Sequence, residues 1–275
     1  MKRTKMISFL VLAMILFPAW VHTQQGANTT SHTSVLERIT QRGALIVGTA
    51  GSMPPFNMTT KEGDVIGIEP DMAKLMAEEM GVKLRLEVMP FSKLLPALKA
   101  GDIDLILSQM TVTGKRNMEV AFVGPYFISG KSFVTKVKWM AGVKEASEVN
   151  SPKTRLVALK GSTSVTFVKK DLPRARLVTA EGYEAAVDMV LDGKVDAMVA
   201  DYPICVLTVL RNPKKGLIAV STPLNYEPIG IAVPGNDPLM FNWMENYLNT
   251  LKETGLLDRI KERWLKNEDW LNRLP

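Results

Sequence analysis

Residues able to perform covalent or metal chemistry are scarce in this sequence. The two histidines, His22 and His32, lie near the amino terminus, and the single cysteine, Cys205, stands four residues after Asp201. Serine or cysteine nucleophiles activated by histidine, and metal sites built from histidine, therefore have no support in the body of the chain. Cys205 is interpreted as a small buried core residue rather than a nucleophile. We expect no metal and no cofactor.

Phosphate and nucleic-acid binding also lack support. Neither a GxxxxGK[ST] loop nor a GxGxxG fingerprint occurs. The formal charge is +6, but Lys2, Arg3 and Lys5 supply three of these charges and leave +3 for the remainder. The pairs 169–170 and 214–215 are short lysine runs without interleaved aromatic residues, which is typical of solvated surface. We predict no nucleic-acid partner.

The amino terminus has the pattern of a secretory signal. Three basic residues precede an apolar run at 6–21, which Pro18 interrupts. The alternative is a membrane anchor, but the run is shorter than the ~20 apolar residues of a spanning helix. We expect a signal peptide over about residues 1–27, cleaved on export to the periplasm. Because Cys205 lies far from this run, we expect neither a lipoprotein nor an internal disulfide.

The elements that must position any site alternate between strand and helix. Near the start, the pattern predicts strands at 44–50, 82–88 and 103–107, with helices at 69–80 and around 94–98. A second series predicts strands at 155–159, 175–178 and 195–199, with helices around Phe167 and at 181–191. Such alternation indicates two α/β units with parallel sheets.

Two longer extended stretches, 126–137 and 217–233, interrupt these series and are interpreted as crossings between the two units. The segment 237–270 has helical spacing and is expected to pack back on the first unit. Ligands of open α/β sheets bind beyond the carboxyl ends of the strands. A cleft between the units is therefore the predicted site.

Several motifs carry a resemblance to a known family. They are VGTAGSMPPFNM, DVIGIEPDMAKLMAEEMGVK, LLPALKAGDIDLILSQMTVTGKR, VGPYFISG, LKGSTSVTF, LDGKVDAMVADYP and EPIGIAVPGND. In this order they resemble the periplasmic amino-acid-binding proteins of ATP-binding-cassette importers, the family 3 solute-binding proteins. The resemblance extends from about Leu36 to the carboxy-terminal helices.

The resemblance implies a type II periplasmic-binding-protein fold, in which two α/β lobes are joined by two hinge strands. Lobe 1 would comprise residues 34–126 and 229–275, and lobe 2 residues 130–224. The hinges would lie near 126–130 and 225–229.

The resemblance also assigns roles to residues of the cleft. In the TxTxxR motif, Arg116 would grip the ligand's α-carboxylate and Thr111 would add a hydrogen bond. Asp201 would accept from the α-ammonium group, and Thr163 would donate to the carboxylate beside the amides of a helix N-terminus. The alternatives are a surface arginine on a helix for Arg116, and helix caps for Asp201 and Thr163.

Other positions bear on the choice of ligand. Phe91 and Met53 match cleft-lining positions of relatives, with core packing as the alternative. Gln109 and Ser164, together with Lys160, would recognise a polar side chain, whereas Met53 and Phe91 with Met110 would form an apolar pocket; the sequence leaves both open. Ala50 replaces the aspartate of basic-amino-acid binders, which favours a polar or apolar amino acid over a basic one.

We therefore expect a monomeric, non-enzymatic receptor that closes on a small amino acid and delivers it to an ATP-binding-cassette permease of the inner membrane. One alternative is a cyclohexadienyl or arogenate dehydratase on the same fold. In those enzymes a glutamate follows the GT motif by two positions, where this chain has Val165. A ligand-sensing receptor is a further alternative.

Overall fold

The computed structural model describes residues 33–267 and 269–275, and Thr33–Pro275 forms one compact unit. The predicted signal peptide and both histidines lie outside the described residues. Within the described part, no helix combines the length and apolar character needed to cross a membrane.

The first of two five-stranded sheets has the strand order β5-β1-β6-β13-β7. We call the part of the chain built on it lobe 1. Its strands are β1 (Ala44–Thr49), β5 (Lys83–Val88), β6 (Leu105–Ile106), β7 (Val120–Ser129) and β13 (Glu227–Pro234), and its helices are α1 (Val35–Arg42), α2 (Ile68–Glu79), α3 (Phe91–Ala100), α4 (Gly114–Asn117), α8 (Pro238–Glu253) and α9 (Leu256–Leu265). A small antiparallel sheet of β2 (Ser52–Met53), β3 (Asn57–Thr59) and β4 (Val65–Ile66) and the 3-10 helix η3 (Asp269–Arg273) complete it.

The second five-stranded sheet has the order β10-β9-β11-β8-β12 and forms lobe 2. Its strands are β8 (Lys131–Thr135), β9 (Arg155–Leu159), β10 (Arg176–Ala180), β11 (Ala197–Asp201) and β12 (Ile218–Ala219), and its helices are α5 (Thr163–Asp171), α6 (Tyr183–Leu191), α7 (Tyr202–Arg211) and the 3-10 turns η1 (Lys138–Gly142) and η2 (Ala146–Val149).

The prediction of parallel sheets is only partly right. β1 pairs in parallel with β5 and β6, and β9 with β10 and β11, as strand–helix alternation requires. β13 is antiparallel to β6 and β7, and β8 is antiparallel to β11 and β12. β8 and β13 lie in the two extended stretches, and each enters its sheet from the other lobe rather than from a preceding helix.

Apolar side chains cover both faces of the first sheet, which explains its continuous hydrophobic runs. Leu45 and Val47 of β1 point into one core with α1, α2, α8 and α9, whereas Ile46 points into another with α3. The expectation that the carboxy-terminal helices pack on the first unit is confirmed, since Tyr247 Oη of α8 donates to Met72 O of α2 at 2.7 Å.

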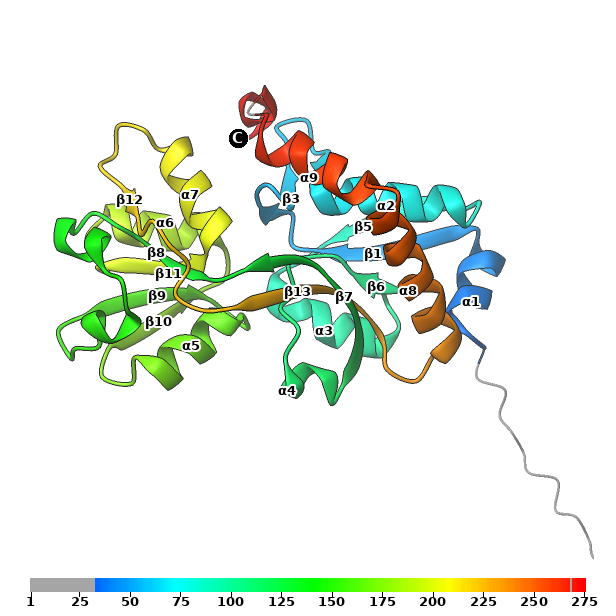
Figure 1. The fold of residues 1–275 in the computed structure, drawn as a ribbon, viewed down its shortest axis with the longest axis horizontal. Helices are drawn as coiled ribbons and strands as arrows, with labels where there is room; N and C mark the ends of the chain where they lie inside the picture. Colours follow the sequence, from blue (N-terminus) through cyan, green and yellow to red (C-terminus); the bar gives the residue numbers. More distant parts are fainter. Residues whose placement is uncertain (1–32, 268) are drawn as a thin grey trace, which may run out of the picture. The chain divides into compact units, whose positions relative to one another are not determined.

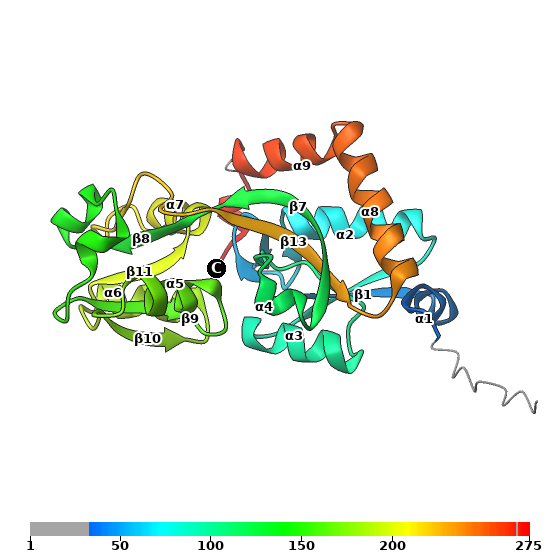
Figure 2. The ribbon, with the colours of Figure 1, turned by 60° about the horizontal axis from the view of Figure 1, so that its bottom comes forward.

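Two segments connect the lobes, and they lie side by side in Figures 1 and 2. β7 pairs with β13 from Val120↔Pro234 to Ser129↔Glu227. Beyond this ladder the two segments stay in contact, because Leu224 N donates to Lys131 O at 2.8 Å. The expected fold class, two α/β lobes joined by two hinge strands, is confirmed. The residue boundaries of the lobes stay a prediction.

Candidate functional site

A cavity of about 10 Å³ lies where the two lobes meet. Leu159 and Asp201 end β9 and β11 of lobe 2, and Gln109 follows β6 of lobe 1, so the cavity forms beyond the carboxyl ends of strands. The lining residues are Met53, Phe91, Gln109, Thr111, Arg116, Lys131, Leu159, Ser162, Thr163, Tyr183 and Asp201. A larger hollow of about 470 Å³ shares Thr111, Arg116 and Thr163 with it and is bordered by Glu227.

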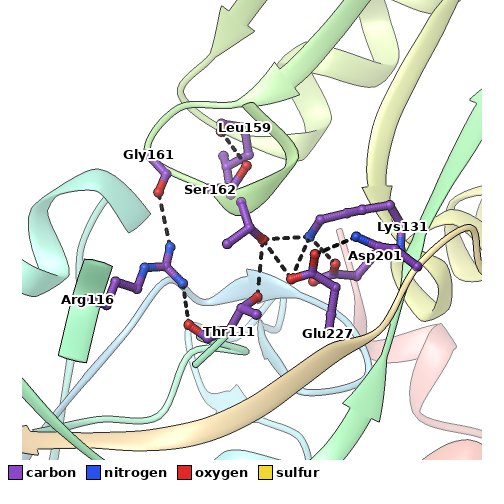
Figure 3. Close-up of polar contacts among 10 residues, drawn as sticks. Thr111, Arg116, Lys131, Leu159, Gly161, Ser162, Asp201 and Glu227 are labelled. Carbon is purple, nitrogen blue, oxygen red and sulfur yellow. Dashed lines mark hydrogen bonds and ion pairs between the residues drawn. The ribbon is translucent and has the colours of Figure 1, made fainter. Parts of the chain in front are cut away.

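Arg116 lies on the short helix α4, and only 9% of it is exposed. Its Nη1 donates to Thr111 O at 2.7 Å in lobe 1, and its Nη2 donates to Gly161 O at 3.2 Å in lobe 2 (Figure 3). The guanidinium carbon lies 5.6 Å from the centre of the Phe91 ring. Burial lowers the pKa of Arg116 to about 10, while Glu227 and Asp201 oppose this shift, so the side chain is cationic at neutral pH. Arg116 is thus not the surface arginine of the alternative interpretation.

Asp201 ends β11, and its carboxylate is engaged by a lysine. Lys131 Nζ donates to Asp201 Oδ1 at 2.6 Å, and both side chains are buried. Burial raises the pKa of Asp201, although the Lys131 ammonium opposes the shift. Asp201 occupies the N-cap position of α7, as the alternative interpretation expects, but its side chain makes no cap hydrogen bond to that helix.

Two threonine hydroxyls join the lobes between these charged groups. Thr111 Oγ1 of lobe 1 lies 3.2 Å from Thr163 Oγ1 of lobe 2. Thr163 Oγ1 also accepts from Lys131 Nζ at 2.7 Å and donates to Glu227 Oε2 at 3.0 Å. Thr163 is the first residue of α5, and Ser162 holds the cap position, so the amides of this helix face the same region.

Gln109 has an unusual backbone, with φ of +48°. Its amide N–H donates to Glu69 Oε1 at 2.6 Å, and Glu69 Oε1 also accepts from the Tyr126 hydroxyl. The side-chain amide of Gln109 is buried, and among the described residues it has no hydrogen-bond partner. Glu69 therefore fixes a main-chain turn that presents this amide at the cavity.

The structure brings together most of the predicted site residues. Met53, Phe91, Gln109, Thr111, Arg116, Thr163 and Asp201 all line the cavity. Ser164 lies outside this lining, buried on α5. Lys160 is more than half exposed and pairs with Glu181 at 2.5 Å.

Sequence reasoning missed Lys131 and Glu227. Lys131 directly follows the first expected hinge, and Glu227 lies within the second. The usable signal was a charged residue inside a β-branched and aromatic stretch, because charged side chains in buried strands need a partner. Over residues 33–267 and 269–275, no cluster of His, Cys, Asp or Glu side chains is suited to hold a metal ion.

Solved structures with this architecture are type II periplasmic binding proteins, which is the class the two lobes and two hinge strands define. A putative binding component of an ABC transporter from Wolinella succinogenes, complexed with lysine, is 36% identical with a TM-score of 0.79, over 84% of this chain and 99% of that one.

Residues 45–267 match the bacterial extracellular solute-binding proteins, family 3, and the chain belongs to this family. Among its curated relatives, the cyclohexadienyl dehydratase of Pseudomonas aeruginosa is 25% identical over 87% of this chain and 89% of its own. The glutamine-binding protein GlnH of Bacillus subtilis is 28% identical over 88% of each chain.

Proposed function

We propose that this protein is an extracytoplasmic receptor that captures a small amino acid, or a close analogue of one, by its carboxylate between the two lobes. It delivers this solute to an ATP-binding-cassette permease. The observation that carries the proposal is the buried guanidinium of Arg116, which contacts main-chain carbonyls of both lobes. Family membership supports export and a permease partner.

The chemistry of Arg116 fits a planar carboxylate. Arg116 has five N–H donors, and the two carbonyl contacts use two of them. The remaining N–H groups can bind both oxygens of a carboxylate. Phe91 against the guanidinium removes water from one side, which strengthens charged hydrogen bonds. Thr111 and Thr163 add hydroxyls beside the carboxylate position.

Closure of the lobes is the second part of the proposal. A ligand held by Arg116 and Thr111 from lobe 1 and by Thr163 from lobe 2 contacts both lobes at once. Such contacts exist only in the closed form, so the ligand shifts the population toward it. The names of relatives that bind glutamine or lysine support amino acids as the ligand class, and Ala50 favours a polar or apolar side chain over a basic one.

The test is a thermal-shift screen of amino acids on protein that has been unfolded and refolded to remove co-purified ligand. A ligand at one hundred times its Kd should raise the Tm by about 5–10 °C for a chain of this size. Arg116→Ala should abolish the shift. The control, Arg263→Ala, removes an exposed arginine that also lies over an aromatic ring, Trp264. Binding retained in Arg116→Ala would exclude the proposed carboxylate site.

A dehydratase is the second candidate, and the Pseudomonas aeruginosa relative supports it. Asp201 supports it too, because it places a buried carboxyl group at the cavity. Val165 argues against it, because a valine cannot replace the glutamate of those enzymes. Conversion of prephenate or arogenate, lost in Asp201→Asn, would establish the enzyme in place of the receptor.

A further inference from the structure

The feature that carries a further inference is the buried ammonium group of Lys131 inside the cleft. Lys131 is 1% exposed. Its Nζ lies 2.6 Å from Asp201 Oδ1, 2.7 Å from Thr163 Oγ1 and 3.5 Å from Glu227 Oε2 (Figure 3). A lysine ammonium has three N–H donors. Two of them are donated to Asp201 and Thr163, and the contact with Glu227 is a longer ion pair.

The main chain holds Lys131 in this place. It is the first residue of β8, where it pairs with Asp201 across the antiparallel ladder. Its N–H donates to Asn225 Oδ1 at 2.7 Å, and its carbonyl accepts from Leu224 N at 2.8 Å. Segments of both crossings between the lobes thus hold the main chain of Lys131. Its ammonium group is therefore a fixed, buried feature of the cleft rather than a flexible group on the surface.

Lys131 supplies what the α-ammonium group of an amino acid would bring. It places one positive charge and several N–H donors against Asp201, the carboxylate expected to receive that group. A ligand ammonium at the same position would face a like charge at close range in a buried site, which is costly.

From this we infer that the ligand is a carboxylic acid with an uncharged oxygen at the α-carbon, an α-hydroxy or α-oxo acid, for which Lys131 provides the ammonium that an amino acid would carry itself. This inference rests on the proposed function, because it assumes that Arg116 binds the carboxylate. An α-oxygen accepts a hydrogen bond from the Lys131 ammonium in place of its 3.5 Å contact with Glu227. An α-hydroxyl can in addition donate to Asp201.

The competing arrangement is an amino acid whose ammonium displaces Lys131 from Asp201 toward Glu227, which lies within 3.5 Å. The two arrangements make opposite predictions for matched ligands. Calorimetric titration of the refolded full-length protein should use sets that differ only at the α-carbon. Suitable sets are alanine with lactate and pyruvate, aspartate with malate and oxaloacetate, and phenylalanine with phenyllactate and phenylpyruvate.

For the protein with Lys131 in place, an oxygen analogue should bind at least about tenfold more tightly than the amino acid of its set, which corresponds to one unit in log Kd. In Lys131→Gln the preference should reverse, because Asp201 and Glu227 then lack a cation. Lys194→Gln is the control, since Lys194 pairs with Asp192 at 2.9 Å but is exposed. It should leave the preference unchanged.

Tighter binding of an amino acid than of both its analogues would overturn the inference and leave the proposed receptor standing. The same holds for a preference that Lys131→Gln does not alter. If no member of any set binds, the inference fails, and the thermal-shift screen of amino acids decides the receptor proposal separately. Should Lys131→Gln not fold, as judged by circular dichroism, the preference of the unaltered protein decides alone.

Discussion

At the scale of single residues, Glu69 shows how a buried charge supports the cleft. It lies in the first turn of α2 and is fully buried. Its carboxylate accepts from Gln109 N at 2.6 Å, from Asn57 Nδ2 at 2.5 Å and from the Tyr126 hydroxyl. Burial raises its pKa, and these three hydrogen bonds offset only part of the shift. Its negative charge is therefore a cost to folding.

Glu69→Gln is expected to be more stable than the wild type, and the difference in the free energy of unfolding is expected to grow as the pH rises. The folded pKa of Glu69 lies above its unfolded value of about 4.5, so the folded state binds the extra proton between these two values. The wild type therefore loses stability relative to the glutamine variant across that window, by about 1.4 kcal/mol per pH unit, and the difference then stays constant. A flipped Asn57 amide offers its Oδ1, which lacks a partner among the described residues, to the new amide.

Urea unfolding of both proteins from about pH 4 to about pH 8 measures this difference. Glu253→Gln, at an exposed position of α8, controls for the loss of one carboxylate. A stability difference that does not grow with pH would contradict the account of Glu69.

Single residues also show what the sequence could and could not predict at the site. Arg116 and Asp201 stand in short contiguous motifs, and the structure places both at the cavity. Lys131 gave no comparable signal, because lysine in a strand usually faces solvent. Its burial depends on Asp201 and Glu227, which lie far away in sequence and meet it only when β8, β11 and β13 are in place.

At the scale of elements, Gly130 is the point where the two crossings touch. It joins β7 to β8, and a Cβ atom there would lie 2.2 Å from Asn225 O and 2.6 Å from Pro223 Cβ. Asn225 O is a main-chain atom, so it cannot move aside without moving the second crossing. Glycine is therefore required for close approach at this position.

Gly130→Ala should destabilise the protein by about 1–3 kcal/mol, because it overpacks the contact between the crossings. It should also weaken ligand binding, since the same displacement moves Lys131. Urea unfolding and calorimetric titration measure the two effects. Gly142→Ala is the matched control, because a Cβ at Gly142 meets nothing within 4 Å. Equal stability of the two variants would contradict the prediction, because it would show that the two crossings can move apart at position 130 without a cost in stability.

Elements were predicted well where the signal is local. The strand predicted at 155–159 has these bounds in the structure, and α2 differs from the predicted helix by one residue at each end. The long β7 was expected only from 126, whereas it begins at Val120. Its first half is extended because β13 pairs with it, and no local pattern reveals a partner about a hundred residues away.

At the scale of the whole molecule, the cavity of about 10 Å³ has room for about one water molecule at most. An amino acid or an organic acid cannot occupy it unless the lobes separate. The polar contacts between the lobes include those of Arg116 with Gly161 and of Thr111 with Thr163, and those of Glu227 with Thr163 and Lys131. We therefore expect entry of a ligand into this cavity to require motion about the crossings.

A disulfide between positions 111 and 163 tests this requirement. The two threonine hydroxyls are 3.2 Å apart, so the sulfur atoms of Thr111→Cys and Thr163→Cys need only a small shift to form a bond of about 2.05 Å. The oxidised double variant should not take up ligand, and reduction should restore the affinity of the reduced variant. Cys205 should not interfere, because burial raises its pKa to about 12.

Thr163→Cys alone, treated with the same oxidant, controls for oxidation elsewhere. Uptake of ligand by protein whose disulfide is verified by mass spectrometry would show that the cleft admits ligand without opening.

The network around Lys131 has a kinetic consequence. Because Glu227 of lobe 1 contacts both Thr163 and Lys131 of lobe 2, the protein's own contacts favour the closed form before any solute arrives. Encounter with solute is then productive only in the fraction of time that the lobes are apart. The observed association rate would stop rising with solute concentration once it reaches the rate at which the lobes open spontaneously. Lobe opening, rather than solute concentration, would then limit the rate of solute uptake.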